Sequence, residues 1–226
     1  MFQLDSELIM TLNVFKVLIV SSIVIINSAA YANDAPWVGY DIKGKPCRGI
    51  TPHLGPFDYT KAYLHETELS LVQAAHFNTN VELLLQGAKQ KGNMLGDIHY
   101  TLKAFPNHHR ALNTVINYRL KNGPYTNKGI KQPECYFLRA VNFVPKDDMT
   151  IMLYGLYLHR INQLSEAETM YKKALLINPN NIQAMYNYGL LSIDLGNIEQ
   201  AKSLAKKVYS KGFSLKGLQR KIDAYQ

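Results

Sequence analysis

The sequence has few cysteines and few charged residues for its length. Only 2 of its 226 residues are Cys, which excludes a disulfide-dense miniprotein and a four-cysteine zinc site. Charged residues make up 19% of the chain, below the usual share of about 25%. The 47% of hydrophobic residues are nevertheless enough for a core, so wholesale disorder is excluded. With 14 Gly and 9 Pro, the chain is neither collagen-like nor of low complexity.

Motifs of catalysis and of phosphate binding are lacking as well. The sequence contains no G-x-S-x-G, no H-E-x-x-H and no C-x-x-C-H, and neither cysteine lies in a C-x-x-C. The glycines between Gly87 and Gly96 have neither the spacing nor the preceding strand of a phosphate-binding loop. We therefore predict a protein that is not an enzyme and that holds no cofactor.

An apolar run near the N-terminus has the pattern of a secretory signal. Val17 to Ile26 reads VLIVSSIVII, Lys16 precedes it, and the small-x-small triplet Ala30-Tyr31-Ala32 follows it. A transmembrane helix needs about 20 apolar residues, and this run is shorter.

We predict that residues 1–32 are a signal peptide that is cleaved after Ala32. The protein is then expected in the periplasm or outside the cell. Membrane association is expected only if the signal stays uncleaved. Initiation at Met1 and initiation at Met10 are both compatible with this pattern.

Export affects the interpretation of the two cysteines, Cys47 and Cys135. An isolated pair in an oxidising compartment usually forms a disulfide, which would here close a loop of 88 residues. A redox or metal-binding role is the alternative, although the chain lacks the paired spacing typical of such sites. We predict the disulfide.

The second half of the chain repeats with a period of 34 residues. The recurring residues are Tyr154-Gly155 with Tyr188-Gly189, and Ala167 with Ala201. We expect the two glycines to let a neighbouring helix backbone approach closely. Asn162-Gln163 and Gly196-Asn197 are expected to form turns between paired helices, and Pro179 to end a helix.

These motifs resemble the tetratricopeptide repeat family. The resemblance implies an all-α solenoid of helix-turn-helix units. It covers about Asn107 to Tyr225 and implies three units followed by a capping helix. The expected ranges are 107–147, 148–181 and 182–213 for the units and 214–225 for the cap.

Residues 33–106 are predicted to form a loop-rich N-terminal region with short helices. Helices are expected over Lys61–Glu68, Val81–Ala88 and Asp97–Phe105, the last capped by Asp97, whereas Leu69–Phe77 fits a helix or a strand. The stretch AFPNHHRAL, residues 104–112, has no assigned role. With its surroundings it resembles small exported bacterial tetratricopeptide proteins of uncharacterised role, a resemblance that supplies no activity.

Four histidines lie close together in the sequence, and they suggest an alternative function. They are His76, His99, His108 and His109. Imidazoles bind metals, so a small-ligand or metal-binding periplasmic protein is conceivable. Neighbouring histidines on a helix point about 100° apart, however, and do not easily bind one ion together. Packing or solvent exposure is the simpler interpretation.

The net charge of +8 is concentrated in the C-terminal third. The cations there are Lys172, Lys173, Lys202, Lys206, Lys207, Lys211, Lys216, Arg220 and Lys221. In an exported protein these charges favour acidic envelope partners, or a merely solvated surface, over nucleic acid.

The resemblance also implies where a partner binds. First helices line the concave groove in the family, which gives five candidate residues: Tyr154, Tyr157, Tyr186, Asn187 and Tyr188. The predicted function is a non-enzymatic interaction module or adaptor in the bacterial envelope, with an acidic protein or peptide as its partner.

Overall fold

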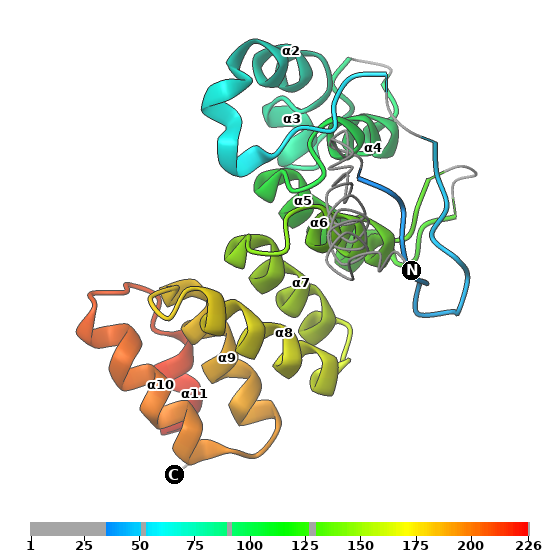
Figure 1. The fold of residues 1–226 in the computed structure, drawn as a ribbon. Coiled ribbons are helices and arrows are strands. Elements are labelled where there is room, and N and C mark those ends of the chain that lie inside the picture. Colours follow the sequence, from blue (N-terminus) through cyan, green and yellow to red (C-terminus); the bar gives the residue numbers. More distant parts are fainter. Residues whose placement is uncertain (1–34, 51–52, 90–91, 127–129, 226) are drawn as a thin grey trace, which may run out of the picture. The chain divides into compact units, whose positions relative to one another are not determined.

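The described part of the chain is helical. The computed structural model describes residues 35–50, 53–89, 92–126 and 130–225, and these ranges contain no β-strand beyond one isolated bridge between Tyr40 and Pro46 (Figure 1). The chain divides into two units, residues 1–32 and residues 33–226. The predicted signal peptide is the first unit and lies outside the described residues.

Eleven helices follow one another through these ranges (Figure 1). They are η1 (Tyr59–Leu64), α2 (Glu66–His76), α3 (Thr79–Glu82), α4 (Met94–Ala104), α5 (His109–Asn122), α6 (Pro133–Phe143), α7 (Asp148–Arg160), α8 (Leu164–Ile177), α9 (Ile182–Asp194), α10 (Ile198–Ser210) and α11 (Gly217–Asp223).

Helices α7 to α10 form two consecutive pairs with equivalent cores. The pairs are α7 with α8 and α9 with α10, and α11 packs on the second pair. Tyr171 and Ala174 of α8 are fully buried, and Ala205 and Val208 are buried 34 residues later. The predicted turns are present, with Asn162 and Gly196 both at positive φ (64° and 76°). The all-α solenoid architecture is therefore confirmed.

Gly155 and Gly189 make room for side chains, not for a helix backbone as the sequence suggested. A Cβ atom on Gly155 would lie 2.9 Å from the ring of Tyr171. A Cβ atom on Gly189 would lie 2.6 Å from Leu218 of α11. Each glycine lies close to the adjacent helix, as expected, but a large side chain of that helix makes the contact and not its backbone.

Three helix junctions have the same backbone hydrogen bonds. The residue after each preceding helix donates its N–H to the carbonyl four residues earlier, in the pairs Phe105–Thr101, Val144–Ala140 and Asn178–Ala174. The side chain at the start of the next helix then accepts an N–H three residues on: Ala111 donates to His108, Thr150 to Asp147 and Ala184 to Asn181. The junctions therefore have one geometry.

The AFPNHHRAL stretch is the first of these junctions. His108 occupies the N-cap position of α5 that Asp147 and Asn181 occupy before α7 and α9. In α4, Ile98 and Thr101 are buried at the register of Phe137 and Ala140 in α6. Helix α4 therefore has the position of a second helix in a unit that precedes α5.

Polar side chains connect successive junctions. The carboxylate of Asp147 is buried, and it accepts hydrogen bonds from Asn107 Nδ2 (2.9 Å) and Thr150 Oγ1 (2.7 Å). It also pairs with His109 Nε2 at 2.8 Å. Burial by itself would raise the pKa of Asp147, but the hydrogen bonds from His109, Thr150 and Asn107 outweigh it and lower the pKa.

Replacing Asp147 with Ala is expected to destabilise the protein by about 3 kcal/mol, because a helix cap and charge-assisted hydrogen bonds are lost together. Asp147→Asn is the matched control, since Asn181 caps α9 with an amide. It should retain the cap and lose roughly half as much. Urea unfolding at neutral pH measures both changes, and equal losses would rule out a separate contribution of the charge.

The N-terminal helices differ from their expected bounds. The helix expected over Lys61–Glu68 breaks at His65, between η1 and α2, and Leu69–Phe77 is helical up to His76. The helix expected over Val81–Ala88 ends at Glu82, since Leu84 adopts a positive φ of 57°.

Asp97 does not cap α4, as the sequence suggested; Asn93 does. The Asp97 carboxylate instead accepts the N–H of Ala88 at 2.8 Å and pairs with Nδ1 of His76 at 2.9 Å. Asn78 Nδ2 donates to the Ala88 carbonyl, so side chains hold the backbone that was expected to be helical. The capping helix is also shorter than 214–225, because it begins at Gly217.

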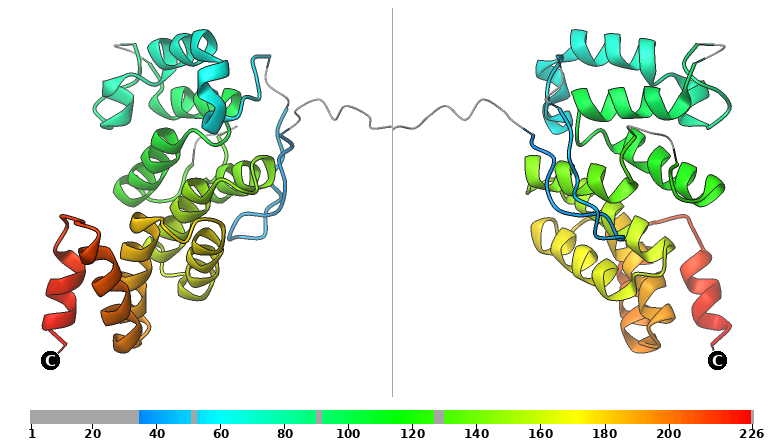
Figure 2. Two further views of the ribbon diagram at one scale, coloured as in Figure 1. Left: turned by 60° about the vertical axis from the view of Figure 1, so that its left-hand side comes forward. Right: turned by 90° about the vertical axis from the view of Figure 1, so that its right-hand side faces the viewer.

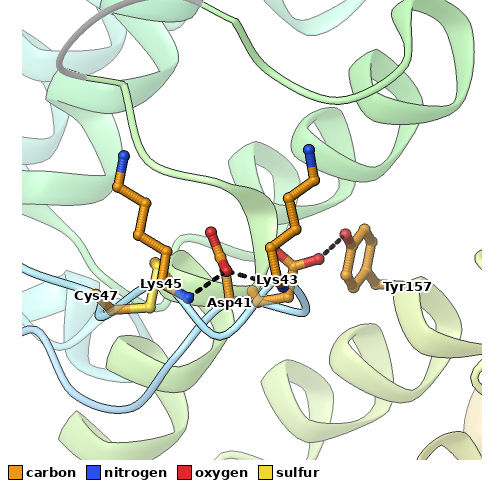
Figure 3. The surroundings of a disulfide bond; sticks show 7 residues. Asp41, Lys43, Lys45, Cys47 and Tyr157 are labelled. Carbon is orange, nitrogen blue, oxygen red and sulfur yellow. Dashed lines mark hydrogen bonds between the residues drawn. A yellow bond between two sulfur atoms is a disulfide. The ribbon is translucent and has the colours of Figure 1, made fainter.

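Residues 35–50 form a segment without helix, here called the strap, which folds back on itself between Tyr40 and Pro46 and lies alongside the helices (Figure 2). A disulfide between Cys47 and Cys135 joins the strap to α6 (Figure 3). Arg139 of α6 is buried and donates to the carbonyls of Ala35 and Leu102, both at 2.6 Å. The strap is thus attached to the helices by a covalent bond and by buried hydrogen bonds.

Candidate functional site

A groove of about 700 Å³ lies along the first helices of the last two pairs. Helix α7 contributes Leu156, His159 and Arg160, and α9 contributes Gln183, Tyr186, Asn187, Leu190 and Asp194. Leu215 and Lys221, before and within α11, lie at its C-terminal side. The groove combines leucine side chains with amides and cations.

Two of the five candidate groove residues line this groove. They are Tyr186, whose ring packs on Phe213 at 4.9 Å between ring centroids, and Asn187, whose Nδ2 lies 3.3 Å from Met152 Sδ. Both are largely buried, at 8% and 5% exposure, so each offers only an edge to the groove.

Tyr157 and Tyr188 instead lie in the core and bond to carboxylates of neighbouring helices. Tyr157 is fully buried and its hydroxyl donates to Glu134. The hydroxyl of Tyr188 donates to Glu168 at 2.9 Å and accepts from Gln200 at 2.7 Å. Burial first, and the adjacent carboxylate second, raise the pKa of both tyrosines. The structure gives them a packing role.

Tyr154 also lies away from the groove. Its ring is stacked on Phe137, with centroids 5.2 Å apart and planes at 7°. Burial raises the pKa of Tyr154 to about 12. The five candidates therefore separate into a groove pair and three packing residues.

Asp194 connects three helices at one end of the groove. Its carboxylate pairs with His159 Nε2 of α7 at 2.8 Å and with Lys221 Nζ of α11 at 3.1 Å. Partial burial opposes ionisation, yet the bonds from His159 and Lys221 lower the pKa of Asp194. Arg160 is exposed beside this network, so the groove lining as a whole is positive.

The α9 groove residues that sequence reasoning missed are Gln183, Leu190 and Asp194, and they form a helical stripe with the predicted Asn187. Gln183, Asn187, Leu190 and Asp194 follow one another at spacings of four, three and four residues. Such residues share one face of a helix. The stripe was readable in the sequence, but the repeat directed attention to the tyrosines.

The four clustered histidines bind four different partners. The pairs are His76 with Asp97, His99 with Tyr136, His108 with Gln73 and His109 with Asp147. Within the described ranges, no group of three His, Cys, Asp or Glu side chains is placed to hold a metal ion. The structure gives these histidines separate structural roles instead of one shared site.

Models of a known family match the part of the chain that contains the groove helices α7 and α9. Models of the tetratricopeptide repeat match residues 150–181 and residues 170–203, which span α7 to α9 and the start of α10. The chain carries tetratricopeptide repeats. No curated protein matches the chain. The tetratricopeptide repeats indicate a protein–protein interaction module with a protein partner.

None of the helices in the described part of the chain is both long enough and apolar enough to span a membrane.

Proposed function

We propose that the protein is a non-enzymatic adaptor that binds an extended segment of a partner protein in the groove between α7 and α9. The observation that carries this proposal is the groove itself, which runs along the tetratricopeptide repeat helices and offers about 700 Å³. A volume of this size accommodates several side chains of a peptide.

The groove lining suggests which peptide fits. Leu156, Leu190 and Leu215 offer apolar contacts, while the Gln183 amide can hydrogen-bond an extended backbone. Arg160 is the exposed cation of the lining that has no ion pair among the described residues. The proposed partner segment therefore combines apolar residues with acidic ones.

A photo-crosslinking amino acid at Gln183 is expected to capture a partner polypeptide, because this position faces the groove. The matched control carries the same amino acid at Lys206, which is exposed on α10 and outside the groove lining. Arg160→Glu should reduce capture at Gln183 by about tenfold, as a like charge replaces an attractive one. Mass spectrometry of crosslinked products reads the result.

Equal capture at Gln183 and Lys206, insensitive to Arg160→Glu, would contradict the groove proposal. Capture at Lys206 alone would indicate that the partner binds the exposed lysines of α10 instead of the groove.

The proposed adaptor is exported and acts in the bacterial envelope. Two observations support this: the signal-like run of residues 17–26 with Ala30-Tyr31-Ala32 after it, and the disulfide between Cys47 and Cys135. Disulfides of this kind persist in oxidising compartments. Export would also leave an acidic protein as a more accessible partner than nucleic acid.

A further inference from the structure

A second cavity lies away from the groove, between the strap and helices α4 and α6. Trp37, Gly49 and Ile50 of the strap line it, together with His99 and Lys103 of α4 and with Lys131, which precedes α6. Its volume is about 260 Å³. A cavity of this size holds a small ion with its water shell but not an extended peptide.

The cavity is positively charged. Lys103 and Lys131 are both half-buried, and none of the residues lining the cavity is acidic. Neither lysine forms an ion pair with a carboxylate in the described part of the chain. Lys131 Nζ lies 5.9 Å from the ring centroid of Trp37, over which the guanidinium of Arg139 also lies at 4.9 Å. Two cations therefore lie over the Trp37 ring, and Lys103 lines the same cavity.

His99 adds a neutral donor to this cavity. Its Nδ1 lies 2.8 Å from the hydroxyl of Tyr136, which is fully buried and whose pKa burial raises. With the phenol O–H as the donor to Nδ1, the neutral ring carries its hydrogen on Nε2. Burial, and then the charges of Lys103, Lys131 and Arg139, lower the pKa of His99 to about 4. Near pH 7 the ring is a hydrogen-bond donor without charge.

We propose that this cavity binds a phosphate or sulfate group, held by the ammonium groups of Lys103 and Lys131 and by Nε2–H of His99. Lysines are compact point charges that suit a tetrahedral oxyanion, whereas planar carboxylates are best matched by the two-pronged guanidinium of arginine. A bound oxyanion would neutralise two half-buried cations that lack a described carboxylate partner.

The strap makes this site dependent on the disulfide. Gly49 and Ile50 lie two and three residues after Cys47, and a Cβ atom on Gly49 would overlap the Trp37 indole nitrogen. Release of Cys47 from Cys135 removes the covalent bond that holds this wall against α6. Reduction of the intact protein is therefore expected to weaken oxyanion binding.

Isothermal titration of the oxidised full-length protein with inorganic phosphate, and separately with sulfate, tests the proposal. Lys103→Gln/Lys131→Gln should weaken binding by about tenfold or more, as two charge-assisted contacts are lost. Lys206→Gln/Lys207→Gln removes the same charge from exposed positions on α10 and should leave the affinity unchanged. Circular dichroism confirms that each variant is folded.

Two outcomes would overturn the proposal: absence of phosphate and sulfate binding at tens of millimolar, and equal weakening in both double variants. Vesicles that contain phosphatidylglycerol test whether the oxyanion is a lipid headgroup or a soluble ion. Vesicle binding that free phosphate displaces, and that Lys103→Gln/Lys131→Gln removes, assigns a lipid headgroup. Phosphate binding without vesicle binding assigns a soluble oxyanion. Neither arm involves the groove between α7 and α9.

Discussion

Acidification from about pH 6 to about pH 5 is expected to lower the free energy of unfolding by about 2–3 kcal/mol through His99 and His108. Burial lowers the pKa of His108 to about 3 and that of His99 to about 4, from 6.5 in an unfolded chain. Between the folded-state pKa and 6.5, the unfolded state binds more protons than the folded state. The free energy of unfolding therefore has its full value above about pH 6.5 and decreases as the pH falls. Each histidine contributes a slope of about 1.4 kcal/mol per pH unit in this window.

The structural cause at His108 is its position as an N-cap. Its Nδ1 accepts the N–H of Ala111 at 3.1 Å, and the other ring nitrogen lies 2.9 Å from the Gln73 amide. Protonation of Nδ1 would remove the acceptor from a fully buried helix start. The imidazole therefore has to stay neutral for α5 to remain capped.

His108→Asn separates the cap from the titration. Asparagine caps α9 at the equivalent Asn181, and it does not ionise. The variant should roughly halve the slope of stability against pH. Urea unfolding at several pH values gives these slopes. An unchanged slope in His108→Asn would mean that this ring does not govern acid sensitivity.

Removing the disulfide is expected to cost about 4–5 kcal/mol, which is the loop-closure entropy that a bond spanning such a long loop takes from the unfolded chain. The bond between Cys47 and Cys135 has a sequence separation of 88 residues. Cys47→Ser/Cys135→Ser should therefore show a large decrease in the urea midpoint, while the helix content at low urea is retained.

The reduced wild-type protein is the control for this double variant, because it has the same connectivity without the substitutions. An intact mass measured under non-reducing conditions checks the bond directly, and two free thiols in the native protein would contradict it. The same mass, taken on protein from the envelope fraction, reports whether the chain begins at Asn33, as cleavage after Ala32 requires.

The sequence was most informative where residue type and spacing acted together. The 34-residue period placed α7 to α10 correctly, because small residues such as Ala167 and Ala201 are needed wherever two helices cross closely. The two cysteines have only each other as partners among cysteines, and the structure joins them. Both features follow from the type, spacing and number of residues in the sequence.

Other features depended on contacts that spacing does not reveal. Tyr157 and Tyr188 lie on first helices, where the family resemblance implies groove residues, but Glu134 and Glu168 on neighbouring helices accept hydrogen bonds from their hydroxyls and hold them in the core. The first junction was hidden for a related reason, since a histidine occupies the N-cap position that aspartate or asparagine usually takes.

The chain of polar contacts through the junctions has a consequence for how the solenoid unfolds. It runs from Asp58 to Asn107, from Asn107 to Asp147, and from Asp148 to Asn178 and Asn181. In a linear array of repeats, cooperativity is set by the coupling between nearest neighbours relative to the stability of each repeat. Hydrogen bonds that cross every junction strengthen this coupling. We therefore expect hydrogen exchange to report one common opening energy from α5 to α9, instead of a series of values that declines from one repeat to the next.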